Sequence, residues 1–267
     1  MMSEGNVLYA FALTAVAGLS TGIGGVISLF AKKTNTRFLT AALGLSAGVM
    51  VYISFVEMMP AAADLLNAAY GSRMGGLYAI LAFFGGMLLI GVIDGLVPHE
   101  DNPHEAGNWQ VGERDSGERL KRAGILTALA VGIHNFPEGI ATFVSALRDP
   151  TAAIAIVAAI AIHNIPEGIA VATPIYHATG SKKKALLWSF LSGMAEPLGA
   201  LMGWLILMPF MSDALYGILF AAISGIMIFI SFDELLPNAQ QYGEHHVAIG
   251  GVITGMAIMA VSLVMFL

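Results

Sequence analysis

Long apolar stretches separated by short polar segments run from one end of the 267-residue chain to the other. Each stretch has about 20 residues or more, the length that a helix needs to cross a hydrocarbon core of roughly 30 Å. The pattern predicts an all-α integral membrane protein, with residues 1–267 forming a single transmembrane domain. The eight predicted spans are 7–31, 38–61, 76–97, 123–147, 151–176, 185–207, 214–236 and 247–267.

The composition supports this class and excludes several others. Hydrophobic residues make up 57% of the chain and charged residues 11%, against roughly 25% charged residues in soluble domains. The absence of cysteine excludes disulfide scaffolds, thiolate zinc sites and cysteine catalysis. A net charge of −6 without a basic patch argues against a nucleic-acid partner. The high hydrophobic content makes the lipid bilayer the expected surrounding.

The basic residues predict the orientation. The loops after spans 1, 3 and 5 hold ten of the twelve Lys and Arg residues, and the other two are Arg73 and Arg148. Because basic loops stay in the cytoplasm, both termini are expected in the periplasm or extracellular space. Spans 1–3 and 6–8 then run in opposite senses. A 3+2+3 arrangement with an inverted repeat is therefore possible, although we expect no clear residue-level match between the two triplets.

One hexapeptide, His-Asn-x-Pro-Glu-Gly, occurs at 134–139 in span 4 and again at 163–168 in span 5. Residues three and four apart share a helix face, so the His, Asn and Glu of each motif point the same way. Each motif begins roughly 18–20 Å from its predicted helix start, at about 1.5 Å per residue. Since the two spans are antiparallel, the motifs should meet near the bilayer midplane. Carboxylates there cost a few kcal/mol and are functional candidates.

The side chains of the motifs suit a divalent metal ion. Imidazole with carboxylate is typical of sites for Zn²⁺, Fe²⁺, Mn²⁺ or Co²⁺, and two facing glutamates repel unless a cation or proton lies between them. Pro137 and Pro166 cannot donate a backbone hydrogen bond, so we expect kinks that free a carbonyl oxygen. Gly139 and Gly168 should permit close helix approach. The alternative is that His and Asn join helices as polar contacts while the glutamates stay protonated.

Two further residues are predicted at the same depth. Glu196 lies twelve residues into span 6, again before a proline, and would complete a carboxylate cluster. A protonated glutamate bonded to a neighbouring helix is the alternative. Met50 in span 2 could offer a thioether, although a chain with 15 methionines uses most of them as core residues.

Acids closer to the membrane faces could attract cations at an entrance and an exit. Glu57 is predicted near the outer end of span 2, and Asp94, Asp233 and Glu234 near the inner ends of spans 3 and 7. Water-exposed helix ends are the alternative. The one long polar loop, 98–121, contains His99 and His104 among acids and could hold metal weakly, or it is a solvated linker.

The paired motifs, the Glu-Pro-Leu-Gly segment at 196–199 and the Ser-Phe-Asp-Glu-Leu-Leu-Pro segment at 231–237 resemble the ZIP (Zrt/Irt-like) divalent metal transporters, most of all their bacterial ZupT-type members. The resemblance implies uptake of zinc, with iron, manganese, cobalt and cadmium, across the bacterial inner membrane by a secondary transporter that commonly dimerises. It also implies a binuclear site: His134, Glu138, His163 and Glu167 hold one ion, and Asn135, Asn164 and Glu196 join the shared glutamates around the second.

Two other functions are alternatives to transport. An intramembrane metalloenzyme could use the same ligands, but the His-Glu-x-x-His motif is absent and the Glu-x-x-His order of dimetal bundles is reversed. A metal-sensing scaffold would need a larger cytoplasmic domain than loop 98–121 provides. Transport is therefore the favoured hypothesis, and net metal flux distinguishes it from both alternatives.

Overall fold

The computed structural model describes residues 4–30, 36–95, 116–148, 150, 152–240 and 244–265. The predicted all-α class is confirmed, since every element within these ranges is helical. Seven of the described helical stretches are long and apolar enough to cross a membrane: Asn6–Ser28, Arg37–Tyr70, Ser72–Gly95, Ile156–Thr179, Lys182–Phe210, Asp213–Gln240 and His245–Met265. The chain is therefore a multi-pass membrane protein. The helix that carries the first motif is not among the seven, because its charged first turns and polar motif lower its average hydrophobicity.

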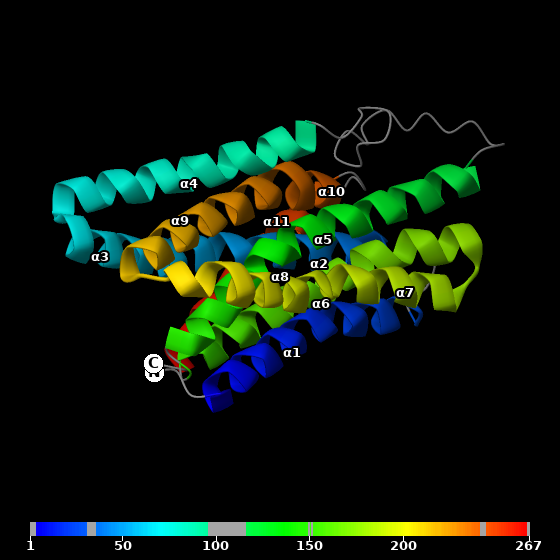
Figure 1. Ribbon diagram of the computed structural model, residues 1–267. Helices are drawn as coiled ribbons and strands as arrows, with labels where there is room; N and C mark the ends of the chain where they lie inside the picture. The colour runs from blue at the N-terminus through cyan, green and yellow to red at the C-terminus, as the bar shows by residue number, and fades with distance from the viewer. Residues whose placement is uncertain are drawn as a thin grey trace.

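The helices follow one another in the order that Figure 1 shows. They are α1 (Glu4–Ser28), α2 (Thr36–Ile53), η1 (Ser54–Met58), α3 (Met59–Tyr70), α4 (Ser72–Gly95), α5 (Ser116–Arg148), α6 (Ala152–Thr179), α7 (Lys182–Gly193), α8 (Ala195–Met202), η3 (Gly203–Leu207), η4 (Met208–Phe210), α9 (Asp213–Ile230), η5 (Ser231–Leu235), α10 (Leu236–Gln240) and α11 (His245–Met265).

Two helix ends lie farthest from the predicted span ends. The second helical stretch runs nine residues beyond 61, because 61–70 is rich in alanine and leucine, which favour helix whatever the polarity of their neighbours. It stops at Gly71, whose φ of 81° is open to glycine at no steric cost. Helix α5 begins at Ser116, inside the predicted loop 98–121. His99 and His104 of that loop lie outside the described residues.

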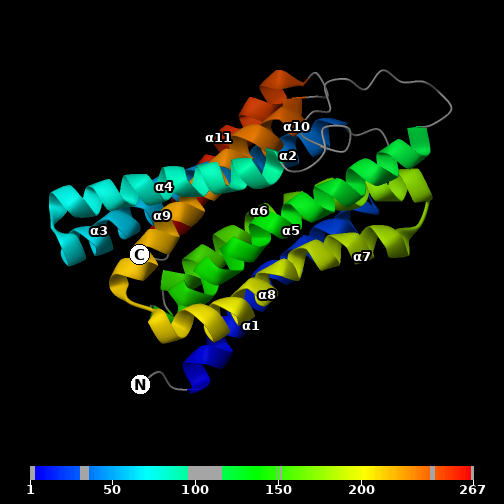
Figure 2. The same cartoon turned by 45° about the horizontal axis from the view of Figure 1, so that its top comes forward.

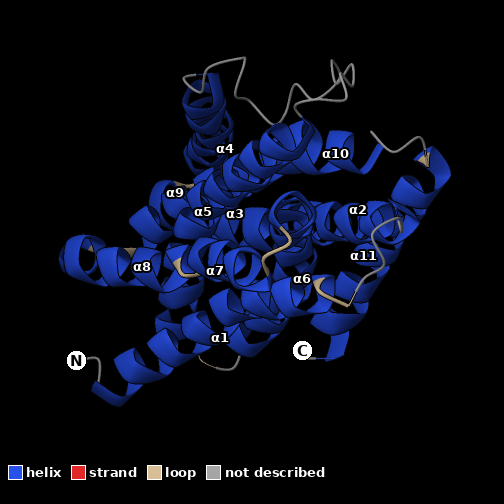
Figure 3. Ribbon diagram, turned by 90° about the vertical axis from the view of Figure 1, so that its right-hand side faces the viewer, coloured by secondary structure: helices blue, strands red, loops and turns tan. Residues whose placement is uncertain are grey.

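Helices α5 and α6 pack against each other in the middle of the bundle. Figures 1 and 2 show α1, α7 and α8 on one side of this central pair, and α4, α9, α10 and α11 on the other. In the view along the bundle, α4 lies at the edge farthest from α1 (Figure 3). Leu81, Phe84 and Leu88 on α4 are exposed apolar side chains, as a lipid-facing helix requires.

The first three and last three spans share a sequence repeat that the sequence analysis missed. Residues 54–60, Ser-Phe-Val-Glu-Met-Met-Pro, match residues 231–237, Ser-Phe-Asp-Glu-Leu-Leu-Pro. Both segments form a π-helical turn. The N–H of Met59 donates to the carbonyl of Ser54 in the first, and the N–H of Leu236 donates to the carbonyl of Ser231 in the second. A proline follows each turn and has no N–H for a helical bond. The expectation of no residue-level match is therefore wrong for spans 2 and 7.

The packing of the helices repeats in the same way. Helix α2 packs on α11 as α9 packs on α4, and α1 packs on α6 as α8 packs on α5. A Cβ on Gly139 would collide with the backbone of Glu196 on α8, and one on Gly168 would collide with the backbone of Thr21 on α1. The predicted close approach at these two glycines is confirmed.

Candidate metal centre

The two motifs face each other across α5 and α6, and each imidazole contacts the glutamate of the other helix. His134 Nε2 lies 3.2 Å from Glu167 Oε2, and His163 Nε2 lies 2.9 Å from Glu138 Oε1. All four side chains are buried. Both helices continue through Pro137 and Pro166, so the His and Glu of each motif remain one turn apart on one face. The structure thus brings together the four residues predicted to form the centre.

The two asparagines are held by the backbone of the flanking helices. Asn164 Nδ2 donates to the carbonyl of Ala17 on α1 at 3.0 Å, and Asn135 Nδ2 donates to that of Ser192 on α7 at 3.4 Å. Asn164 Nδ2 also donates to Glu196 Oε1, so the buried Glu196 on α8 lies beside the second motif. Since the amide nitrogens are engaged, the amide oxygens are left for another partner.

Several buried atoms of the centre have no hydrogen-bond partner among the described residues. They are His134 Nδ1, Asn135 Oδ1, both carboxylate oxygens of Glu138, both ring nitrogens of His163, Asn164 Oδ1 and Glu196 Oε2. The short contact between His163 and Glu138 is not aligned as a hydrogen bond, so its atoms belong to this set. Unsatisfied buried polar atoms are costly, and a cation satisfies oxygen and nitrogen lone pairs together.

The arrangement consists of pairs rather than a complete ligand shell. Among the described residues, no three or more His, Asp or Glu side chains are placed so that they could hold an ion together. Two ligand atoms at about 2.1 Å from a tetrahedral ion are about 3.4 Å apart. The cross pairs, at 2.9 and 3.2 Å, are within a few tenths of an ångström of that spacing. Only small side-chain movements are therefore needed to bring the two atoms of each pair to the spacing of metal ligands.

Glu234 and Ser46 lie beside the motifs in a way that the sequence analysis did not predict. Glu234 Oε2, in the π-helical turn η5, is buried 3.9 Å from His134 Nδ1, so the water-exposed alternative is wrong for this residue. Ser46 Oγ on α2 lies 3.3 Å from Glu167 Oε1. Met50 is buried one turn after Ser46 and shares its helix face. The recurrence of Glu57 as Glu234 in the repeat was a usable signal, whereas a lone serine in an apolar span was not.

The other predicted acids are more exposed. Glu57 in η1, Asp94 in the last turn of α4 and Asp233 in η5 are all partly exposed. Their positions as entrance or exit groups stay a prediction.

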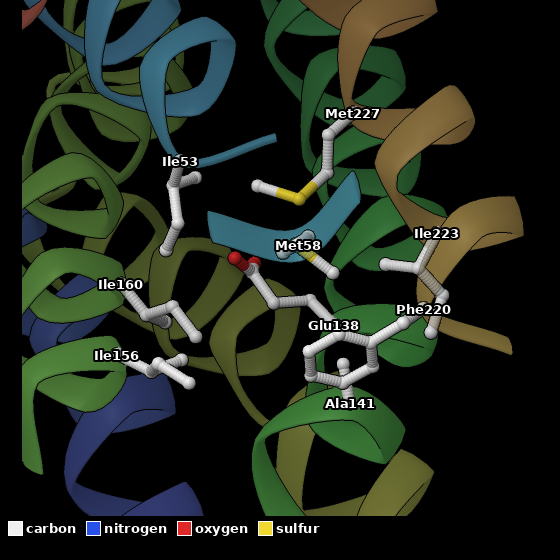
Figure 4. A pocket seen from close by; sticks show the side chains of 9 residues that line it. All are labelled: Ile53, Met58, Glu138, Ala141, Ile156, Ile160, Phe220, Ile223 and Met227. Carbon is white, nitrogen blue, oxygen red and sulfur yellow. The ribbon is translucent and has the colours of Figure 1, made fainter. Parts of the chain in front are cut away.

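Glu138 borders a small pocket between the central pair and helices α2 and α9. Figure 4 shows its carboxylate among apolar side chains. The neighbours include Ile53 and Met58 from the second span, Ile160 from α6, and Ile223 and Met227 from α9. This glutamate therefore has apolar surroundings on the side that faces the pocket.

The sequence is similar to known proteins over its whole length. The family described as ZIP Zinc transporter matches residues 97–263. A protein named Zinc transporter ZupT from Streptococcus mutans is 59% identical, with 98% of this chain and 99% of the relative covered. Proteins of the same name from Nitratidesulfovibrio vulgaris and Corynebacterium efficiens are 54% and 55% identical, and each comparison covers all of both chains.

Proposed function

Because this chain belongs to the ZIP zinc transporter family, we propose that it takes up zinc across the bacterial cytoplasmic membrane through the centre on α5, α6 and α8. The ion is the substrate of a secondary transporter. Iron, manganese, cobalt and cadmium are proposed as further substrates, since imidazole, carboxylate and amide donors suit all of these divalent ions.

The observation that carries the proposal is the cross-pairing of two buried His–Glu sets beside oxygens that lack hydrogen bonds. One ion binds between His134, Glu138, His163 and Glu167. A second binds to Asn135, Asn164 and Glu196 with the glutamates shared, because Asn164 already links Glu196 to the motif pair. Met50 is proposed as an additional thioether ligand from α2.

Binding exchanges protons for metal at these groups. An imidazole ligates only when neutral and a carboxylate only when ionised, so zinc binding releases protons from the centre. The ion replaces the contact within each cross pair and cancels the repulsion between the two glutamates. Burial then favours the loaded centre over an empty one whose carboxylates are both charged.

The membrane arrangement proposed is eight spans with α5 as the fourth. At 33 residues α5 is about 50 Å long, enough to cross the bilayer. Its polar motif faces α6 and α8 rather than lipid. Helix α1 begins and α11 ends towards the same end of the bundle, as an even number of spans requires (Figures 1 and 2). With the basic loops inside, both termini lie outside.

The 3+2+3 arrangement is supported by the repeat in spans 2 and 7 and by the paired helix contacts. An inverted repeat around a central pair places the binding site at the repeat interface, a feature of many secondary transporters. The homodimer implied by the resemblance remains a prediction of the same proposal.

Zinc uptake into liposomes reconstituted with the full chain tests the proposed function. We expect saturable uptake by the native chain and a loss of at least tenfold in Glu138→Ala, because one His–Glu pair can no longer hold an ion. Glu244→Ala, which removes a carboxylate far from the centre, is the matched control and should keep uptake. Zinc binding without flux would contradict transport, and full activity of Glu138→Ala would contradict the site.

A further inference from the structure

We propose that Ser46 is a positioning residue that holds the Glu167 carboxylate ready for the metal ion, while Glu138 has no such restraint. The inference rests on the proposed function. It makes the two glutamates of the repeated motif chemically unequal, although their motifs differ at one position only.

The first observation is the direction of the Ser46 side chain. Hydroxyl groups in buried helices commonly bond a carbonyl of their own helix, as Ser28 Oγ does with Gly25 at 2.7 Å and Thr142 Oγ1 with Glu138 at 2.9 Å. Ser46 instead reaches across to α6. Its Oγ lies 3.3 Å from Glu167 Oε1 and 3.4 Å from the carbonyl of His163.

The second observation is that the contact with Ser46 holds the second oxygen of the Glu167 carboxylate. One carboxylate oxygen, Oε2, lies against His134, and the other, Oε1, accepts from Ser46. The carboxylate is therefore oriented at both oxygens before any ion arrives. Because Ser46 itself is completely buried, water does not compete for its hydroxyl.

The third observation is the different residue at the equivalent place in the second half. The repeat aligns Ser54 with Ser231, and eight residues before them stand Ser46 and Ile223. Ile223 lines the pocket beside Glu138 and has no hydroxyl to offer (Figure 4). Both oxygens of Glu138 lack a hydrogen bond among the described residues, in contrast to those of Glu167.

The consequence is that the two glutamates have different roles in binding the ion. A carboxylate fixed in advance binds an ion without losing further side-chain freedom, so Ser46 raises affinity. Glu138 contacts His163 but has no hydroxyl that fixes its carboxylate, so it can turn towards an arriving ion and away from a leaving one. Removing the Ser46 hydroxyl should therefore weaken zinc binding more than it slows transport.

The test compares Ser46→Ala, Ser46→Thr and the native chain by zinc uptake into liposomes and by equilibrium zinc binding to the purified protein. We expect Ser46→Ala to raise the KM and the zinc Kd roughly three- to tenfold, the range of a typical lost hydrogen bond, with Vmax changed less than twofold. Ser46→Thr keeps the hydroxyl and should stay within twofold. Ser28→Ala, a buried serine bonded within α1, is the matched control.

Three outcomes would overturn the inference: unchanged KM and Kd in Ser46→Ala, a fall in Vmax with KM unchanged, or the same KM shift in Ser28→Ala. Failure of the proposed function is distinct from all three. It shows as absent uptake by the native chain or as full uptake by Glu138→Ala, and the zinc Kd of Ser46→Ala then still decides the role of Ser46. If Ser46→Thr is too bulky to fold, Ser46→Ala and Ser28→Ala are sufficient.

Discussion

The π-helical turns η1 and η5 carry the same sequence pattern but lie in different surroundings. In η5, Glu234 is buried 3.9 Å from His134 of the central pair. In η1, the equivalent Glu57 is partly exposed. The two halves are thus built alike, with α2 on α11 matching α9 on α4, yet the equivalent glutamates differ in burial. The shared sequence shows that Glu57 and Glu234 occupy equivalent positions in the two halves, whereas the conformation determines what each of them contacts.

The strongest test of the equivalence replaces the glycines of the motifs. Gly139→Ala and Gly168→Ala each place a Cβ against a backbone carbonyl of the flanking helix, which cannot move aside as a side chain can. Alanine gains up to about 1 kcal/mol of helix propensity, but forced overpacking costs about 1–3 kcal/mol or more. We expect the rate of zinc uptake per inserted protein to fall more than about tenfold in each variant.

The control is Gly85→Ala on α4, where a Cβ would meet no atom within 4 Å. Uptake by this variant should match the native chain. If one motif glycine tolerates alanine and the other does not, the two sides of the central pair are not equivalent, and the repeat in packing has no functional counterpart.

A second test concerns the acids of the π-helical turns. Glu234→Gln removes a charge beside His134, so we expect the KM for zinc to rise roughly fivefold, which corresponds to about 1 kcal/mol. Glu57→Gln, the same change in the more exposed turn, should shift the KM less than twofold, since water screens that carboxylate. Concentration series of initial uptake rates measure both. Equal shifts would show that the structural difference between the halves has no consequence for binding.

The sequence predicts the centre well because ionisable side chains in apolar helices are rare and costly. This makes functional candidates of His134, Glu138, His163 and Glu167. Glu196 follows from its depth in the neighbouring span. Glu234 and Ser46 could not be placed, because their contacts depend on how distant helices pack. A π-helical turn adds a residue to the helical count, so a regular count does not give the direction of Glu234. The helix continues to Tyr70, beyond the apolar stretch that ends at 61, because Asp64 and Asn67 make 61–70 less hydrophobic without interrupting the helix.

The smallest expected effect concerns an ion pair that ties the central pair to the second half. Arg148 at the end of α5 lies 2.5 Å from Asp213 at the start of α9, and its guanidinium lies 5.0 Å from the ring centre of Tyr216. Both charges are well exposed, so the pair should contribute at most about 0.5 kcal/mol, screened by salt. Arg148→Ala should lower the thermal midpoint slightly more than Asp213→Ala, because it also loses the contact with the ring.

The matched comparison is the ion pair at 2.9 Å between Arg37 on α2 and Glu244 just before α11, which does not involve the central pair. Arg37→Ala and Glu244→Ala should lower the midpoint by equal, small amounts that vanish in high salt, because the exposed pair is screened. For Arg148→Ala a part of the loss should persist in high salt, since the ring contact is less sensitive to ions. Equal salt dependence in the two arginine variants would show that the ring of Tyr216 adds nothing to the contribution of Arg148.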